Sequence, residues 1–157
     1  MGQYHYLINL TKKQVIHPHR IGNGLKLHEQ VGWPCSTSTA LVMLLSASSK
    51  DGGRGGGDFR CGHPLVGSWA GDRIAFIGDY AEKNDIPNKN AKQIHDLAEL
   101  TCYPGEREYG KEPKPKGWEQ WKDISADVRD MMSQEFGISY KGSGWLEIVD
   151  NKKDTEN

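Results

Sequence analysis

The sequence predicts an α+β fold: a single domain over residues 1–150, with a mainly antiparallel sheet and about three helices. Two observations lead to this class. An alternating apolar pattern near the N-terminus turns back on itself as a hairpin, and the later helix and strand patterns do not alternate as in a doubly wound protein. A chain of 157 residues is long enough to bury one core, and the polar residues 151–157 are expected to form a mobile tail.

The N-terminal hairpin is the first predicted element. Large apolar residues recur at every second position of residues 3–10, which is typical of a strand. A turn at residues 11–13 leads to a returning strand over residues 14–16, and Pro18 ends it because proline cannot donate a ladder hydrogen bond. Residues 22–34, rich in glycine, are expected to be loop with one short strand or helical turn.

Two apolar segments follow the hairpin. Residues 36–49 hold an uninterrupted apolar run between serines and threonines, which favours a buried helix, although a central strand can show the same pattern. Residues 73–79 are apolar on both faces of a strand, so this strand is expected in the centre of the sheet.

The remainder of the chain is predicted to form two helices and a final strand. Asn90 begins a capping box for an amphipathic helix over residues 91–102. A second helix is expected to start after Asp123 as its N-terminal cap and to end at Gly137 as its C-terminal cap. Charged, proline-bearing residues 106–116 indicate an exposed loop between them. The last strand is expected at residues 145–149.

The composition limits the classes of partner. A net charge of -1, from 20 basic and 21 acidic residues, provides no overall field, so bulk binding to nucleic acid is not expected. Three widely spaced cysteines, Cys35, Cys61 and Cys102, do not make a disulfide framework. The sequence shows neither a signal peptide nor a long apolar segment, and we expect a cytoplasmic protein without membrane contact.

A glycine-rich stretch, residues 52–60, is the first candidate site. Its glycines allow close approach to the backbone, and Arg54 and Arg60 could hold an anionic, nucleotide-like ligand. It lacks the Gly-Lys-Ser/Thr ending of a P-loop, and a flexible connection would explain the same composition. Together with the GSWAGDR turn and the end of the next strand, the predicted ligand-binding residues are Arg54, Gly55, Gly56, Gly57, Asp58, Arg60, Trp69, Asp72, Arg73, Asp79 and Tyr80.

An acid–base site is the alternative candidate. His17 or His19 could act as a general base with Asp58 or Asp72, which would give a phosphoester hydrolase or transferase, with or without a metal ion. Asp72 beside Arg73 fits a turn with a surface ion pair equally well.

Metal binding has a weaker basis. His17, His19, Cys61 and His63 carry suitable ligand atoms, but a single residue separates the first two, whereas ligand pairs of structural zinc sites are usually two to four residues apart. We therefore predict no metal site, with the histidines partly exposed on a loop. The residues indicate no cofactor class.

The tryptophans divide into two groups. Trp69, between small residues, and Trp118 and Trp121, near lysines, are candidates for exposed anchors of a partner, although packing in the core is the ordinary role of tryptophan. Trp33 and Trp145 are expected in the core.

Five blocks of the sequence carry a resemblance: MGQYHYLINLTKK, HPHRIGNGLKLHE, TALVMLL, RGGGD and GSWAGDRIAFIGDY. They resemble a family of small proteins of bacteria, archaea and their phages that opens with MGQY and carries GSWAGDRI and GDY blocks. The similarity covers roughly the first 80 residues. It implies a cytoplasmic protein, with a phage genome as one source, and it implies no activity, because none is established for that family.

These observations favour a non-enzymatic binding protein, such as a phage-type factor that binds a host protein or a nucleotide-like anionic ligand. No nucleophile stands beside a base, and the polar residues concentrate in one glycine-rich stretch. The small hydrolase or transferase based on His17 or His19 remains the alternative.

Overall fold

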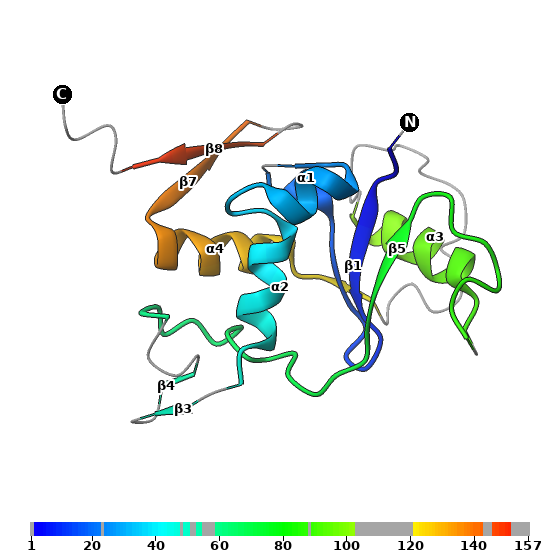
Figure 1. Ribbon diagram of the computed structural model, residues 1–157, viewed down its shortest axis with the longest axis horizontal. Coiled ribbons are helices and arrows are strands. Elements are labelled where there is room, and N and C mark those ends of the chain that lie inside the picture. The colour runs from blue at the N-terminus through cyan, green and yellow to red at the C-terminus, as the bar shows by residue number, and fades with distance from the viewer. Residues whose placement is uncertain are drawn as a thin grey trace.

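The computed structural model describes residues 2–22, 24–47, 49–50, 53–54, 59–87, 89–102, 121–142 and 146–151. The predicted loop at 106–116, together with Trp118, Trp145 and residues 152–157, lies outside these ranges. The α+β class is confirmed: helices pack against a four-stranded sheet with mainly antiparallel pairing (Figure 1).

The main sheet is built on the predicted hairpin. β1 (His5–Asn9) pairs antiparallel with β2 (Gln14–Ile16) on one side and with β5 (Ile74–Gly78) on the other. β6 (Lys122–Asp123) adds to β2 in parallel, so the strand order is β5-β1-β2-β6. β5 is therefore an outer strand of the described sheet, and its predicted central position is wrong.

Helices cover both faces of the sheet, which explains this error. On one face Leu7 and Phe76 pack into a core with α2 (Thr37–Leu45) and α4 (Ser125–Phe136). The alternate side chains of β1 and β5 pack against α3 (Ala91–Cys102) on the other face. Figure 1 shows α3 on the opposite side of β1 and β5 from α2 and α4. An apolar pattern on both faces of a strand thus indicates that both faces of the sheet are covered by helices. It does not indicate that another strand pairs at each edge.

Local capping signals set the ends of the predicted helices. Asn90 Oδ1 accepts a hydrogen bond from Gln93 N (3.0 Å) at the start of α3, and Asp123 Oδ1 accepts one from Ser125 N (2.9 Å) at the start of α4. Gly137 ends α4 in the left-handed region with φ 65°. Both helices are confirmed, as is the helix expected within residues 36–49.

Two short helical elements lie in segments where the sequence predicts no regular helix. η1 (Pro18–Arg20) follows β2 directly, and α1 (Leu27–Gly32) lies inside the predicted loop. Glu29 Oε2 accepts hydrogen bonds from Leu25 N (2.9 Å) and Lys26 N (3.1 Å), which fixes the first turn of α1.

Two small hairpins complete the described structure. β3 (Ser49–Lys50) and β4 (Gly53–Arg54) pair within the glycine-rich part of the sequence. β7 (Ile138–Lys141) and β8 (Glu147–Asp150) pair after α4, and β8 overlaps the strand expected at residues 145–149.

Two tryptophans lie differently from the prediction. Trp69 is fully buried, with 0% of its surface exposed, whereas Trp33 is 49% exposed. Gly67 and Gly71 on either side of Trp69 adopt positive φ (71° and 81°), and these tight turns fold the ring inward. The expectations of an accessible Trp69 and a buried Trp33 are therefore wrong, while Trp121 is partly buried against the core below α3.

Candidate functional site

His17 and His19 lie in a row of aromatic rings at one end of the main sheet. Ring centroids are 4.9 Å apart for Tyr4 and His19, 4.9 Å for His19 and His17, 4.8 Å for His17 and Tyr6, and 4.9 Å for Tyr6 and His95. We call these five residues the ring row. Tyr6, His17 and His95 are buried, and Tyr4 and His19 are half-buried. The prediction of partly exposed loop histidines therefore fits His19 and fails for His17.

The hydrogen bonds of His17 define its protonation state. Nδ1 accepts a hydrogen bond from His19 N (3.0 Å), so the neutral ring carries its proton on Nε2, which lies 3.3 Å from Tyr6 Oη. Burial lowers the pKa of His17 to about 3, with smaller contributions from the neighbouring side chains His19, Arg20 and His95. The ring is therefore neutral at pH 7, and its one lone pair already accepts a hydrogen bond.

The structure does not bring His17 and Asp72 together. His17 lies opposite Tyr6 by the register of the hairpin, whereas Asp72 accepts a hydrogen bond from Asn9 Nδ2 (2.8 Å). Tyr6 and Asn9 are three residues apart on β1, which corresponds to about 10 Å of strand. Asp58 lies outside the described residues. The geometry around His17 thus offers no support for the acid–base alternative.

The GSWAGDR turn joins α2 to the hairpin. Gly67 N donates to Met43 O (2.9 Å) and Trp69 N donates to Leu44 O (2.9 Å). The turn thus supplies hydrogen-bond donors for two of the last carbonyl groups of α2. Trp69 Nε1 also donates to Gln14 Oε1 on β2 (2.7 Å). The turn is thereby anchored inside the fold through its backbone and its tryptophan.

The carboxylate that follows this tryptophan is anchored as well. Asp72 forms an ion pair with Lys12 and accepts a hydrogen bond from Asn9, and these two contacts lower the pKa of Asp72. Arg73 N donates to Thr11 Oγ1 (2.9 Å), and its side chain is exposed. The Asp72–Arg73 surface ion pair considered from the sequence is not formed, since Asp72 pairs with Lys12.

The residues after the glycine-rich stretch lie against α4. Glu135 Oε2 accepts hydrogen bonds from Arg60 N (2.8 Å) and Cys61 N (2.9 Å). Burial raises the pKa of Cys61, which opposes its use as a thiolate ligand. Within the described residues, no three His, Cys, Asp or Glu side chains are placed to hold one metal ion. His17, His19, Cys61 and His63 thus do not form a ligand set.

The remaining predicted ligand-binding residues fall into two places. Gly55–Asp58 lie outside the described residues, and Arg54 is described only as part of β4. Asp79 lies beside the ring row, since its Oδ1 accepts a hydrogen bond from Tyr4 N (3.2 Å), and Tyr80 next to it is exposed. No common site joins these groups in the described structure.

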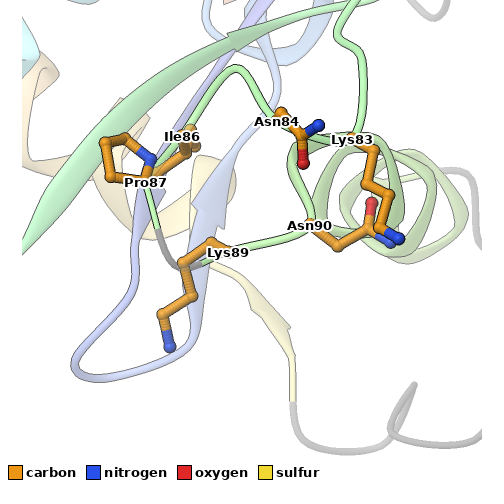
Figure 2. Close-up of a pocket in the computed structure, with 6 residues that line it drawn as sticks. All are labelled: Lys83, Asn84, Ile86, Pro87, Lys89 and Asn90. Atoms are coloured by element: carbon orange, nitrogen blue, oxygen red, sulfur yellow. The ribbon is translucent and has the colours of Figure 1, made fainter.

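A shallow pocket of about 360 Å³ lies at the segment that connects β5 to α3. It is lined by Lys83, Asn84, Ile86, Pro87, Lys89 and Asn90. Figure 2 shows the two lysine amines pointing in different directions, so they do not converge on one anion. The Asn90 side chain is already engaged with Gln93 N at the start of α3.

A different surface carries the exposed apolar side chains. In the described structure, the exposed large hydrophobic residues are Leu27 (43%), Val31 (63%), Trp33 (49%), Val42 (60%) and Tyr80 (57%). Leu27 and Val31 stand one turn apart on α1, and Trp33 follows its last residue. Ser38 Oγ donates to Val31 O (3.0 Å), which holds α2 beside α1.

Val42 lies one turn after Ser38 on the same side of α2, and its side chain is exposed. We call Leu27, Val31, Trp33 and Val42 together the α1–α2 surface, and Figure 1 shows the start of α2 next to α1. The sequence analysis did not identify the α1–α2 surface. Two signals were present: Trp33 stands between Gly32 and Pro34, and α2 carries no charged residue.

Comparison of the chain with protein-family models, with curated proteins and with solved structures gives no match. In the part of the chain that the structure describes, no helix has the length and apolar character required to cross a membrane.

Proposed function

We propose that the chain is a non-enzymatic binding protein that contacts a partner protein through the α1–α2 surface. One observation carries this proposal: four of the five exposed large hydrophobic side chains of the described structure lie on this surface. Exposed apolar side chains that gather in one place are typical of protein-binding sites, whereas single ones are not. Trp33 is the expected anchor, since tryptophan is enriched among the residues that dominate binding energy.

The chemistry of the surface indicates the kind of partner. α2 carries no charged residue over Thr37–Leu45, and the four exposed side chains of the surface are apolar, so the partner should present an apolar surface. The glycine-rich stretch, with the predicted ligand-binding residues Arg54, Gly55, Gly56, Gly57, Asp58 and Arg60, follows α2 in the sequence. A host protein bound by a phage-type factor fits this description.

A photo-crosslinking amino acid in place of Val42 tests the location of the partner. In extract from the source cells, this variant is expected to form a specific crosslinked product that mass spectrometry identifies. The same amino acid in place of Tyr80 is the matched control, because Tyr80 is equally exposed but lies in the segment between β5 and α3. Equal products from both positions would contradict the proposed surface.

The second measurement uses the identified partner in purified form. Trp33→Ala is expected to weaken its binding by about 30-fold, the effect typical of a central aromatic anchor. The free energy of unfolding should change by no more than about 0.5 kcal/mol, because the ring is half exposed and outside the main core. Tyr80→Ala should leave the affinity unchanged. An unchanged affinity for Trp33→Ala would refute the proposal.

A further inference from the structure

The outer strand β5 is open on one side. Arg73 O accepts a hydrogen bond from Leu10 N (2.8 Å) and Asp79 N donates to Tyr4 O (3.0 Å), so these residues direct backbone groups towards β1. Because this direction alternates along a strand, the even-numbered residues of β5, with Phe76 at the centre, direct their N–H and C=O groups away from β1. In the described structure no strand pairs with this side of β5.

The two outer strands of the sheet differ in how they are protected. β6 is two residues long, Lys122 and Asp123, and both are charged. Short, charged outer strands oppose the addition of another strand. β5 has five residues, IAFIG, with neither a charge nor a proline. It therefore lacks the short length, charge and proline that prevent pairing at many sheet edges.

The charges next to β5 are arranged symmetrically. Arg73 precedes the strand and Asp79 follows it, each three residues from Phe76, and both are exposed. If a second β5 pairs antiparallel about Phe76, Arg73 of each copy stands directly opposite Asp79 of the other. Such directly opposed opposite charges stabilise antiparallel pairs. No ion pair of Arg73 or Asp79 occurs within the described part of the chain.

We propose that two copies of this chain associate through β5, antiparallel about Phe76, to form one continuous sheet. The direction of the backbone groups agrees with this register, since Phe76 would exchange both its hydrogen bonds with Phe76 of the second copy. α3 packs across one face of all four strands, so the helix covers the sheet while the pairing would take place at its edge. The symmetric charges favour a second copy over an unrelated peptide.

The oligomeric state of the full chain tests this pairing. Sedimentation equilibrium over a range of concentrations is expected to show a monomer–dimer equilibrium. Arg73→Asp should raise the dimer dissociation constant by about tenfold, because it places like charges opposite each other twice per dimer. A chain that stays monomeric throughout the micromolar range would overturn the proposal.

Two variants separate a specific pair from a general charge effect. The double variant Arg73→Asp, Asp79→Arg reverses both pairs and should restore the dissociation constant to within about threefold of the wild type. Lys122→Asp makes the same charge change on β6, at the other edge of the sheet, and should leave dimerisation unchanged. Equal effects of Lys122→Asp and Arg73→Asp, or no rescue in a folded double variant, would rule out this register.

Hydrogen exchange locates the interface directly. The amide of Phe76 should become more protected as the concentration rises, since its N–H is paired only in the dimer. Trp33→Ala should not alter this protection, so failure of the α1–α2 proposal leaves the present one standing. A dimer in which the Phe76 amide exchanges at the monomer rate would show that the copies meet elsewhere.

Discussion

Replacing Trp69 with alanine is expected to lower the free energy of unfolding by about 3–5 kcal/mol. The ring is fully buried in the core formed with α2 and α4, and its removal leaves a cavity there. The change also leaves Gln14 Oε1, the acceptor for Trp69 Nε1, without this partner. Urea denaturation followed by circular dichroism measures the effect.

Trp33→Ala is the matched control for this experiment, because it removes the same side chain from an exposed position. Trp69→Phe gives a second comparison: it keeps most of the packing and loses the hydrogen bond to Gln14, so it should cost less than the alanine variant. If Trp69→Ala costs no more than Trp33→Ala, the GSWAGDR turn does not have the structural role that its contacts indicate.

Lowering the pH from 6.5 to 4.5 is expected to reduce the free energy of unfolding by about 2 kcal/mol through His17. The pKa of His17 is about 3 in the folded chain and near 6.5 in the unfolded chain. Below pH 6.5 the unfolded chain therefore binds a proton that the folded chain excludes, and stability falls as the pH falls. His19, whose pKa is also lowered by burial, acts in the same direction.

The variant His17→Asn should flatten this dependence, because it removes the titrating ring and keeps an acceptor for His19 N. Its lost packing lowers stability equally at each pH, so the slope is the quantity to compare. His28→Asn, at an exposed position on α1, is the control and should keep the wild-type slope. Asp72 and Glu29, whose pKa values are lowered by hydrogen bonds to Lys12 and to the backbone of Leu25, lose their contribution as the pH falls through their ordinary values of 3.8 and 4.5. Identical slopes for wild type and His17→Asn would contradict the assignment.

The sequence predicts those parts of the fold that depend on neighbouring residues. Asn90, Asp123 and Gly137 act on backbone groups within four residues, so the signals at the ends of α3 and α4 were readable from the sequence, although Asp123 stands one residue before the N-cap of α4. The hairpin of β1 and β2 is equally local. Its alternating pattern and short turn contain all the information that its register requires.

Properties that depend on distant contacts were not predictable in the same way. Small neighbours around Trp69 suggest an accessible ring, but Met43, Leu44 and Gln14, which close around it, come from other parts of the sequence. His17 shows the same limit. Its lowered pKa depends on burial next to Tyr6 and His95, and no feature near residue 17 indicates that α3 lies over it.

The parallel pairing of β2 with β6 has a consequence for synthesis of the chain. His17 N donates to Ser125 Oγ across 108 residues, so this contact forms only after residue 125 has left the ribosome. At usual translation rates, that interval is on the order of 5–20 s, far longer than a hairpin or helix needs to form. Throughout it, β1, β2 and α2 lack the cover of α4. The nascent chain is thus expected to need shielding of β1, β2 and α2 until α4 has been synthesised.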